Sequence, residues 1–464
     1  MSLRSGIPGI AFPALQGGMA AQLMALQLQF DASQWWPPER MRQAQFTQLA
    51  VLLRHAATIP FHAARLRAAR IDPARPLTLD AWHRLPPLTR KEVQREGAGL
   101  HAASLPPGHG GTSEVATGGS TGIPVRVRKS ALDTLFWNAV HIREEVWNRE
   151  DPLGSIARLR RVPAGLDAAQ LAAIWSPEGV SFPDWGPPTS LIWRTGAMHA
   201  IESTQSVAVQ AAFLLRHRPD YIFTLPSNLR LLLAHIRDAG ITLPGLRSVW
   251  TLSEAVDDTL RALCREVLGV RIVSNYSAAE TGWMALQCPQ TDSLHVQSET
   301  CMVEVVDDAG RPVPPGATGR VLVTPLHNFA MPLLRYEIGD TAELGPPCPC
   351  GRGLPVLTRI GGRILDLLTL PDGTLRRTDF DHYGLSKIEA VHEYQVIQRS
   401  RELIEILLVT GRPLTAEETE RVRAILATEY TEGFAFAITE VPSIPRTAAG
   451  KLRPFLSEVA MPPG

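Results

Sequence analysis

The chain lacks a charge excess, a cysteine framework and any long apolar run. Lys and Arg number 46 and so do Asp and Glu, so charge gives no argument for a nucleic-acid or anionic-membrane partner. No apolar run reaches the roughly 18 to 20 residues that span a bilayer, and prolines interrupt the first 18 residues, where a signal peptide needs an apolar stretch. Five cysteines in 464 residues fit a reducing compartment. We expect a cytoplasmic protein that binds a small molecule, with no nucleic acid and no membrane partner.

Strand-like and helix-like segments alternate through the middle of the chain. Residues 218–226, 246–254 and 270–277 have the composition of strands, and residues 227–240 and 257–269 have apolar residues at helical spacing. This alternation predicts parallel βαβ units.

The flanking regions differ from the middle. Residues 37–70 favour helices, and residues 301–345 favour a more antiparallel sheet. In the C-terminal part, Thr415 and Glu418 have the spacing of a helix-capping box. We expect an α/β protein: a large N-terminal domain, residues 1–361, with parallel sheets and a β-rich subdomain, and a small α+β domain, residues 362–464.

The segment TGGSTGIP, residues 117–124, is rich in glycine and hydroxyl side chains. A backbone without bulky side chains presents several N–H groups to one phosphate, and serine and threonine add hydroxyl donors. The lysine of a GxxxxGK[ST] P-loop is missing, and an ordinary turn-rich loop is the other interpretation. The candidate phosphate-binding residues are Thr117, Gly118, Gly119, Ser120, Thr121 and Gly122.

Three further segments contain candidate ligand-binding residues. In NYSAAETG, at the end of an expected strand, Tyr276 can stack on a base and Glu280 can hold a magnesium ion. Asp340 follows a glycine and can bind the two hydroxyls of a ribose, and Arg363 can take phosphate charge. Near the C-terminus, glycine and prolines restrict the backbone around Lys451. A buried tyrosine and solvated charged residues are the alternatives.

In this order, the four segments resemble the adenylate-forming superfamily of acyl-CoA synthetases, non-ribosomal adenylation domains and luciferases. The segments IPFHAARLRAARI, LPPLTRKEV, CPCGR and IPRTAAGK are similar to the phenylacetate-CoA ligase-like branch, and the resemblance covers roughly residues 45–455. It implies that a carboxylic acid attacks ATP to give an acyl-AMP, which a nucleophile, usually the CoA thiol, then cleaves. ATP, Mg²⁺ and CoA are the implied cofactors.

The resemblance also implies a role for each candidate residue. The loop at 117–122 holds the β- and γ-phosphates, Tyr276 lies by the adenine and Asp340 holds the ribose. Glu280 binds magnesium, and Lys451, on a mobile C-terminal domain, bridges the carboxylate and the α-phosphate as the catalytic lysine. Arg363 lies near the nucleotide at the domain junction.

The chain departs from the family at three places. Leu365 stands where an aspartate or lysine is usual, residues 369–384 lack the glycine pattern that approaches the CoA chain, and Ala279 replaces a hydroxyl residue. Transfer to an amine, a hydroxyl or a carrier-protein thiol therefore stays open, as does a relative that binds nucleotide without turnover. The oligomeric state, including a homo-oligomer, stays open too.

The acid-binding residues are less defined. Trp137, His141, Trp250 and the LSEA stretch, residues 252–255, are candidates by position. A helix that packs its own face is the alternative interpretation of Trp137 and His141, and the spacing favours it.

A zinc site is suggested by four residues, Cys288, His295, Cys348 and Cys350. Three thiolates and an imidazole form a closed tetrahedral shell, which is typical of structural zinc. The phenylacetate-CoA ligase-like branch often has a similar arrangement, and reduced loop cysteines are the alternative. Cys264 is expected in a helix core and Cys301 at a strand start.

Overall fold

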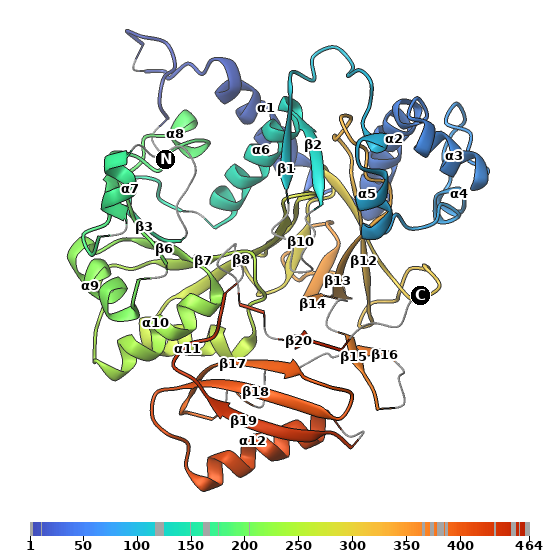
Figure 1. Cartoon of the computed structure of the whole chain (residues 1–464). Coiled ribbons are helices and arrows are strands. Elements are labelled where there is room, and N and C mark those ends of the chain that lie inside the picture. Colours follow the sequence, from blue (N-terminus) through green and yellow to red (C-terminus); the bar gives the residue numbers. More distant parts are fainter. Residues whose placement is uncertain are drawn as a thin grey trace. The chain divides into compact units, whose positions relative to one another are not determined.

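The computed structural model describes residues 3–10, 12–116, 125–148, 150–160, 168–174, 176–203, 205–363, 367–371, 375–377, 385, 388–430, 433–446, 452–453 and 455–459. The chain divides into two compact units, and Figure 1 labels their helices and strands. Unit 1 contains Met1–Leu153, Asp184–Gly196 and Ser274–Gly361, and unit 2 contains Gly154–Pro183, Ala197–Val273 and Gly362–Gly464. The expected domain division, 1–361 and 362–464, stays a prediction. Among the described residues, no helix combines the length and the apolar character that crossing a membrane requires.

Unit 1 combines helices that come mainly from the first third of the chain with mainly antiparallel strands. Its helices are α1 (Gly18–Ser33), α2 (Pro38–Ala56), α3 (Pro60–Ala68), α4 (Leu79–His83), α5 (Arg90–Glu96), the 3₁₀ helix η1 (Gly97–Leu100), α6 (Ala131–Trp147) and α8 (Thr189–Ile192). Its strands are β1 (Thr112–Ala116), β2 (Arg126–Ser130), β9 (Gly282–Gln287), β10 (Leu294–Val296), β11 (Cys301–Val306), β12 (Thr318–Pro325) and β13 (Tyr336–Leu344). Two strands cross the division between the units, β8 (Arg271–Ala278) and β14 (Val356–Arg363).

The unit 1 strands form one sheet in the order β11-β12-β13-β14-β10-β9-β8, and β1 and β2 form a separate antiparallel pair. Antiparallel pairing joins β11 to β12 and β12 to β13, which confirms the prediction for residues 301–345. The helices predicted within residues 37–70 are α2 and α3. One face of the sheet buries an apolar core that includes Tyr276, Met284 and Tyr336, while α1 and α6 pack with Trp283 and Leu286 in another core.

Unit 2 contains the predicted strand and helix alternation. Its helices are α7 (Ala168–Ile174), α9 (Val207–His217), α10 (Pro226–Asp238), α11 (Asp258–Leu268) and α12 (Ala416–Glu429). Its strands are β3 (Ile156–Leu159), β4 (Val180–Phe182), β5 (Met198–Ile201), β6 (Tyr221–Thr224), β7 (Ser248–Thr251), β15 (Leu367–Thr369), β16 (Leu375–Arg377), β17 (Val391–Gln398), β18 (Leu403–Thr410), β19 (Ala435–Glu440) and β20 (Phe455–Ser457).

Parallel pairing joins β7, β6, β3 and β5 in that order, and β4 adds an antiparallel edge. The predicted βαβ units are therefore confirmed. Apolar side chains of α9, α10 and α11 cover this sheet, and Cys264 is fully buried among them as expected. Helix α11 ends at Gly269, whose φ of 70° is a left-handed conformation that glycine adopts without strain.

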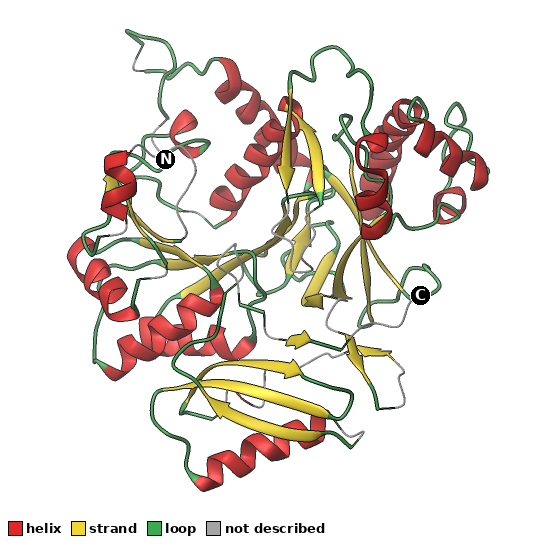
Figure 2. Ribbon diagram, in the orientation of Figure 1, coloured by secondary structure: helices red, strands yellow, loops and turns green. Residues whose placement is uncertain are grey.

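The C-terminal strands form a second sheet in the order β19-β18-β17-β20, with α12 lying along it (Figure 2). Helix α12 begins with the predicted capping box, because Thr415 accepts a hydrogen bond from the Glu418 backbone N–H and Glu418 accepts one from Thr415. Val422 and Leu426 are fully buried against the strands. This part of the chain therefore has the predicted α+β composition.

Helix α6 follows β2 without an intervening loop. Ser130 is both the last residue of β2 and the N-cap of α6. Its side chain caps the Asp133 backbone N–H, and the Asp133 carboxylate accepts the backbone N–H and the hydroxyl of Ser130, each at 2.8 Å. Such a reciprocal pair satisfies backbone donors that a helix start leaves open. The capping box thus fixes where α6 begins relative to β2.

Candidate active site and metal cluster

Tyr276 and Asp340, both predicted to bind the nucleotide, are in contact in unit 1. Tyr276 lies near the end of β8, and Asp340 lies in the middle of β13. The phenol of Tyr276 donates a hydrogen bond to Oδ2 of Asp340 at 2.8 Å. The fold therefore brings together two residues that are 64 positions apart in the sequence.

Glu280 lies on the turn between β8 and β9, where the sequence places the end of a strand. Its side chain is about 5% exposed and lies 3.7 Å from Nη1 of Arg90, which opens α5. Thr89 and Glu92 form a capping box that fixes this helix start. The sequence analysis missed Arg90, although the TRKE pattern marks a capped helix beginning with a cation. A carboxylate in this position can bind magnesium.

Lys129 is a second cation that the sequence analysis did not assign. It lies at the end of β2, with Nζ 5.6 Å from the centre of the Trp137 ring. Burial lowers the pKa of Lys129, and the charges of Asp133 and Glu280 partly oppose this shift. The run of positive charges after the glycine-rich loop is the signal that could have identified it. The turn that carries Glu280 is therefore close to two cations, Arg90 and Lys129.

Several predicted residues lie outside the described part of the chain. These are Lys451 and the six loop residues Thr117, Gly118, Gly119, Ser120, Thr121 and Gly122. The backbone of Arg363 ends β14, and its side chain is not described. Their predicted roles remain predictions.

The described residues on both sides of Lys451 contact β17. Arg446 forms an ion pair with Glu393, whose side chain is 3% exposed. Burial raises the pKa of Glu393, and the charge of Arg446 opposes that shift. The backbone carbonyl of Arg453 accepts a hydrogen bond from Nε2 of Gln395 at 2.8 Å. Two contacts with one strand therefore bracket the segment that contains the predicted catalytic lysine.

The candidate acid-binding residues occupy both units. In unit 1, the ring centre of Trp283 lies 5.3 Å from that of Trp137 and 5.8 Å from that of His141. In unit 2, Trp250 packs against Tyr221, and its indole N–H donates to Ser248 at 2.8 Å. Within residues 252–255, Glu254 accepts hydrogen bonds from the backbone and side chain of Ser227.

Helix α6 also contains two neighbouring acidic residues, Glu144 and Glu145, that contact other elements of unit 1. Glu144 accepts a hydrogen bond from the Asn275 side chain at 3.1 Å, and burial raises the pKa of Glu144 to about 7. Glu145 accepts a hydrogen bond from Thr189 at 2.6 Å and lies 3.2 Å from Nε2 of His141. Trp137, His141, Glu144 and Glu145 all lie on α6, and the contacts of this group with Asn275 and Trp283 place an aromatic and acidic stripe beside β8 and β9.

The four predicted metal ligands form a buried cluster in unit 1. One ligand atom from each of Cys288, His295, Cys348 and Cys350 lies within 4.8 Å of the others. The Cys288 and Cys348 sulfurs are 3.7 Å apart, and the Cys350 sulfur is 3.2 Å from Nε2 of His295. Tetrahedral zinc with Zn–S bonds of about 2.3 Å separates two sulfurs by about 3.8 Å. The arrangement therefore fits zinc.

The environment of the cluster is low in polarity. Burial raises the pKa of the Cys348 thiol to about 11 and lowers the pKa of His295 to about 4. Burial also opposes ionisation of Cys288, but hydrogen bonds from Gln290 and Thr291 hold the pKa of that thiol below its ordinary value. A divalent cation favours deprotonated thiols and neutral imidazole. Four protein ligands would leave no position for a substrate, so the cluster suits a structural metal.

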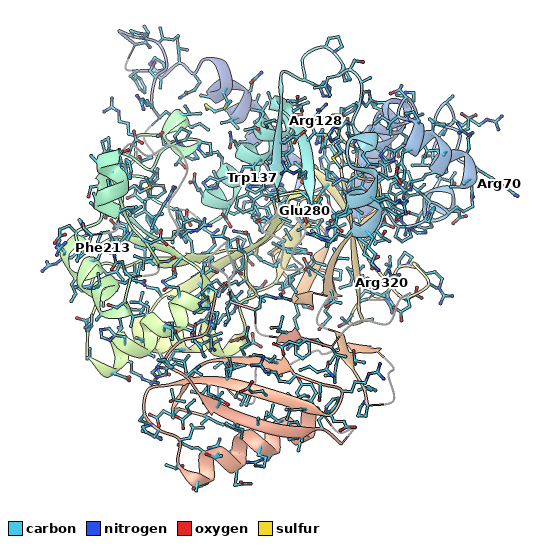
Figure 3. All side chains as sticks on the ribbon, in the orientation of Figure 1. Arg70, Arg128, Trp137, Phe213, Glu280 and Arg320 are labelled. Atoms are coloured by element: carbon cyan, nitrogen blue, oxygen red, sulfur yellow. The ribbon has the colours of Figure 1, made fainter. Side chains whose placement is uncertain are left out.

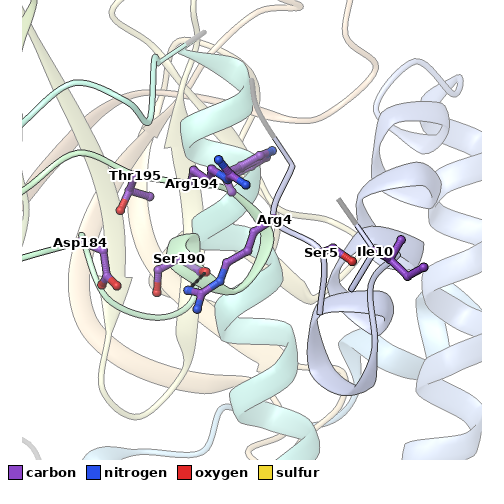
Figure 4. A pocket seen from close by; sticks show the side chains of 8 residues that line it. Arg4, Ser5, Ile10, Asp184, Ser190, Arg194 and Thr195 are labelled. Carbon is purple, nitrogen blue, oxygen red and sulfur yellow. Dashed lines mark hydrogen bonds between the residues drawn. The ribbon is translucent and has the colours of Figure 1, made fainter. Parts of the chain in front are cut away.

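A separate cavity of about 490 Å³ lies near the N-terminal segment (Figure 4). Arg4, Asp184, Ser190 and Arg194 are among the residues that line it. None of the residues predicted from the sequence to bind nucleotide, acid or metal lines this cavity. It therefore provides no support for the predicted site.

Comparison with known proteins gives sequence relatives of one kind. A family model described as AMP-binding enzyme matches residues 190–330. The phenylacetate-coenzyme A ligase of Thermus thermophilus is 27% identical over 276 residues, which cover 53% of this chain and 62% of that ligase. The phenylacetate-coenzyme A ligase of Pseudomonas putida is 25% identical over 197 residues, which cover 40% of this chain and 44% of that ligase. The matched regions thus span less than two thirds of each relative.

A solved structure shares the fold over most of the chain. It is that of 2-hydroxyisobutyryl-CoA ligase in the postadenylation state in complex with 2-HIB-AMP, with a TM-score of 0.70 and 18% identity. The similarity covers 92% of this chain and 91% of that one. The predicted α/β fold class is confirmed by this likeness. The chain is therefore similar to AMP-binding enzymes and to phenylacetate-coenzyme A ligases in sequence, and to a CoA ligase in fold.

Proposed function

We propose that the chain is an ATP-dependent, AMP-forming carboxylate ligase that transfers the acyl group to CoA. The observation that carries this proposal is the hydrogen bond between Tyr276 and Asp340 on the sheet whose β8–β9 turn carries Glu280. The family resemblance assigns these three residues to the adenine, the ribose and the magnesium ion. The matched AMP-binding region contains both Tyr276 and Glu280. Both sequence relatives are phenylacetate-coenzyme A ligases.

The proposed reaction has two displacement steps. First, an oxygen of the substrate carboxylate attacks the α-phosphorus of ATP, and pyrophosphate leaves with the bonding electron pair. Then the CoA thiol loses its proton and its sulfur attacks the acyl carbon, so that AMP leaves with the oxygen it gained. The first transition state gathers negative charge around phosphorus, and positioned cations stabilise that charge.

The described residues supply the surroundings for the first step. The Glu280 carboxylate would hold magnesium, which neutralises phosphate charge when it is bound. Arg90 orients Glu280 through their ion pair, and Lys129 adds positive charge on the same side. Tyr276 and Asp340 would hold the nucleoside. Residues 117–122 would hold the outer phosphates.

The C-terminal part would provide the remaining cation. We propose that residues 362–464 act as a mobile domain that delivers Lys451 to the α-phosphate. The contacts of Arg446 and Arg453 with β17 support this proposal, because both residues lie close to Lys451 in the sequence.

The Cys288, His295, Cys348 and Cys350 cluster is proposed to hold a structural zinc ion. The burial of all four residues and the 3.7 Å sulfur separation support this assignment. Zinc would stabilise the fold and supply no chemistry to the reaction.

The test is acid-dependent pyrophosphate release with ATP and magnesium across aryl, fatty and amino acids, with and without CoA. We expect at least one acid to give release, and we expect an acyl-CoA product when CoA is present. Lys451→Ala should lower the release rate about 100- to 1,000-fold, because one lost transition-state contact typically costs about 3–4 kcal/mol. Lys91→Ala, which changes an exposed lysine of α5, is the matched control and should retain the rate.

Two outcomes would contradict the proposal at different levels. If no acid gives release above background, nucleotide binding without turnover becomes the better explanation. If an acid gives release but mass spectrometry detects no CoA thioester, the acceptor is a different nucleophile, and an amine, a hydroxyl or a carrier-protein thiol should be tested.

A further inference from the structure

The α6 side of the β8–β9 ribbon contains a group of side chains that the proposed reaction does not yet use. Trp137 and Glu280 are both labelled in Figure 3. A Cβ added to Gly282, two residues after Glu280, would lie 3.9 Å from Cε3 of Trp137. Trp137 therefore lies against the start of β9, close to the turn that carries Glu280. Since the acid must reach the magnesium-bound phosphate, this side is within reach of its organic part.

The two sides of the ribbon differ in their partners. Tyr276 belongs to the core on one side and contacts Asp340. Asn275, the preceding residue, instead contacts Glu144 of α6. Successive residues of a strand point to opposite faces. The predicted nucleotide contacts and the α6 stripe therefore lie on opposite faces of one ribbon, with Glu280 at its turn.

Several buried polar atoms on and around α6 have no hydrogen-bond partner among the described residues, and two of them lie beside the aromatic side chains. They are Oε2 of Glu145 and Nε1 of Trp283, and both side chains are more than nine-tenths buried. The other Glu145 oxygen already accepts from Thr189. Buried donors and acceptors without partners are costly and uncommon in folded proteins. A bound molecule that both donates and accepts hydrogen bonds would satisfy them.

The other side chains beside these two atoms are aromatic and come from both α6 and β9. The Trp137 and Trp283 rings are 5.3 Å apart and tilted by 50°, and the ring of His141 lies beyond Trp283. Trp137 and Glu145 are eight residues apart, about 12 Å along the helix axis. This length accommodates an aromatic ring with a short chain between the carboxylate end and the polar end.

We propose that the acid substrate is an aryl acid with a hydroxyl or amino group at the end opposite its carboxylate, and that Glu145 and Trp283 recognise that group. The proposal rests on the proposed function, because it places the substrate carboxylate beside the phosphate whose magnesium ion Glu280 would hold. The aryl ring lies against Trp137 and Trp283, and the polar group donates to Oε2 of Glu145. A hydroxyl can also accept from Nε1 of Trp283. Glu145 and Trp283 are specificity-determining residues in this proposal.

The experiment compares matched acids by pyrophosphate release: phenylacetate, 3-phenylpropionate and cinnamate, each against its 4-hydroxy and 4-amino derivative. We expect kcat/KM to be at least about tenfold higher for a substituted acid than for its unsubstituted partner, since sites built around a hydrogen bond reject analogues that lack it. The hydroxyl and amino series distinguish the two donor types. Equal values within each matched set would overturn the proposal while leaving the proposed function intact.

Variants separate recognition from a structural role. Glu145→Gln keeps the side-chain size and an acceptor for Thr189, and it should reduce the ratio between substituted and unsubstituted acids at least about fivefold. A purely structural role would lower both rates equally and leave the ratio unchanged, which would overturn the proposal. Val146→Thr, on the opposite face of α6 and 39% exposed, is the control and should keep the ratio. Trp283→Phe, which removes the indole N–H donor but also makes the buried ring smaller, should reduce the ratio too and replaces Glu145→Gln if that variant does not fold. If none of these aryl acids gives release but a fatty or amino acid does, this inference fails and the proposed function stands.

Discussion

The two ends of β9 hold different chemistry on one short strand. Before its start, Glu280 lies near Arg90 and Lys129, so this end gathers charged oxygen and nitrogen groups. Directly after its last residue, Cys288 begins a cluster of three thiols and one imidazole. Strand β9 is six residues long, so its first and last residues are about 17 Å apart.

Under the proposed function, one strand would serve two different metals, one at each end. Carboxylate oxygens suit magnesium, whereas thiolates and imidazole suit zinc. The charged end leaves room for phosphate oxygens, and the sulfur end has four protein ligands and needs none. We therefore expect changes at the first end to affect turnover and changes at the second end to affect stability.

The largest effect should come from the charged end. Glu280→Gln keeps the side-chain size but removes the charge that binds magnesium, so pyrophosphate release should fall about 100- to 1,000-fold, or about 3–4 kcal/mol in the barrier. Assays of pyrophosphate release, with an acid that the unchanged protein activates, measure this effect. Thermal unfolding checks that the variant folds. Glu420→Gln, which changes an exposed side chain of α12, is the control. A rate within threefold of the unchanged protein would remove Glu280 from the mechanism.

A change at the sulfur end of β9 should lower the stability of the protein rather than its turnover. A bound metal at about 1,000 times its Kd stabilises a protein by about 4 kcal/mol, so Cys288→Ser should lose the metal and unfold at a lower temperature. Metal content by mass spectrometry and the thermal midpoint with and without chelator measure this. Cys264→Ala, which changes a core cysteine of α11, should keep the metal. If chelation leaves the midpoint unchanged, or the protein binds no zinc, the structural role is wrong.

A third prediction concerns the carboxylate of Glu144, whose pKa burial raises to about 7 from an ordinary 4.5. Because the folded state binds this proton more tightly, the free energy of unfolding should fall as pH rises from about 4.5 to about 7, by up to about 3 kcal/mol. Glu144→Gln is neutral throughout and should be more stable than the unchanged protein at pH 8 but not at pH 4. Urea unfolding at both pH values tests this. An equal difference at both would show that Glu144 does not titrate as described.

The smallest effect should leave both ends of β9 intact. Gln395→Met removes the hydrogen bond to the Arg453 carbonyl, which contributes about 1 kcal/mol. We expect adenylation to slow by up to about fivefold, with zinc content unchanged, because only the segment around Lys451 loses support. Rates and metal content in the same preparation provide the measurement. A loss of zinc would mean that the variant disturbs the fold more widely than one hydrogen bond.

Local patterns predicted much of the fold. The strand and helix alternation at residues 218–277 and the capping box at Thr415 follow from spacing within a few residues, and both are confirmed. The contact of Tyr276 with Asp340 depends on how the sheet is assembled, and only the family resemblance linked them in advance. For the same reason Arg90 was missed, because its contact with Glu280 spans 190 positions.

The metal cluster illustrates the same limit. The CxC pair is local, but its distance to Cys288 and His295 depends on the pairing of β10 with β9 and β14. The unpaired atoms of Glu145 and Trp283 could not be predicted at all, since a missing partner is a property of the packed structure.

The join at Ser130 has a mechanical consequence. Strand β2 continues directly into α6, with no flexible linker between them. A displacement of β2 would therefore move α6 as well, together with its residues Trp137 and Glu145. Adding one residue between Ser130 and Ala131 would rotate the helix by about 100° relative to the strand and turn the whole stripe away from β9. The strand that follows the glycine-rich segment and the helix proposed to face the acid would therefore move together.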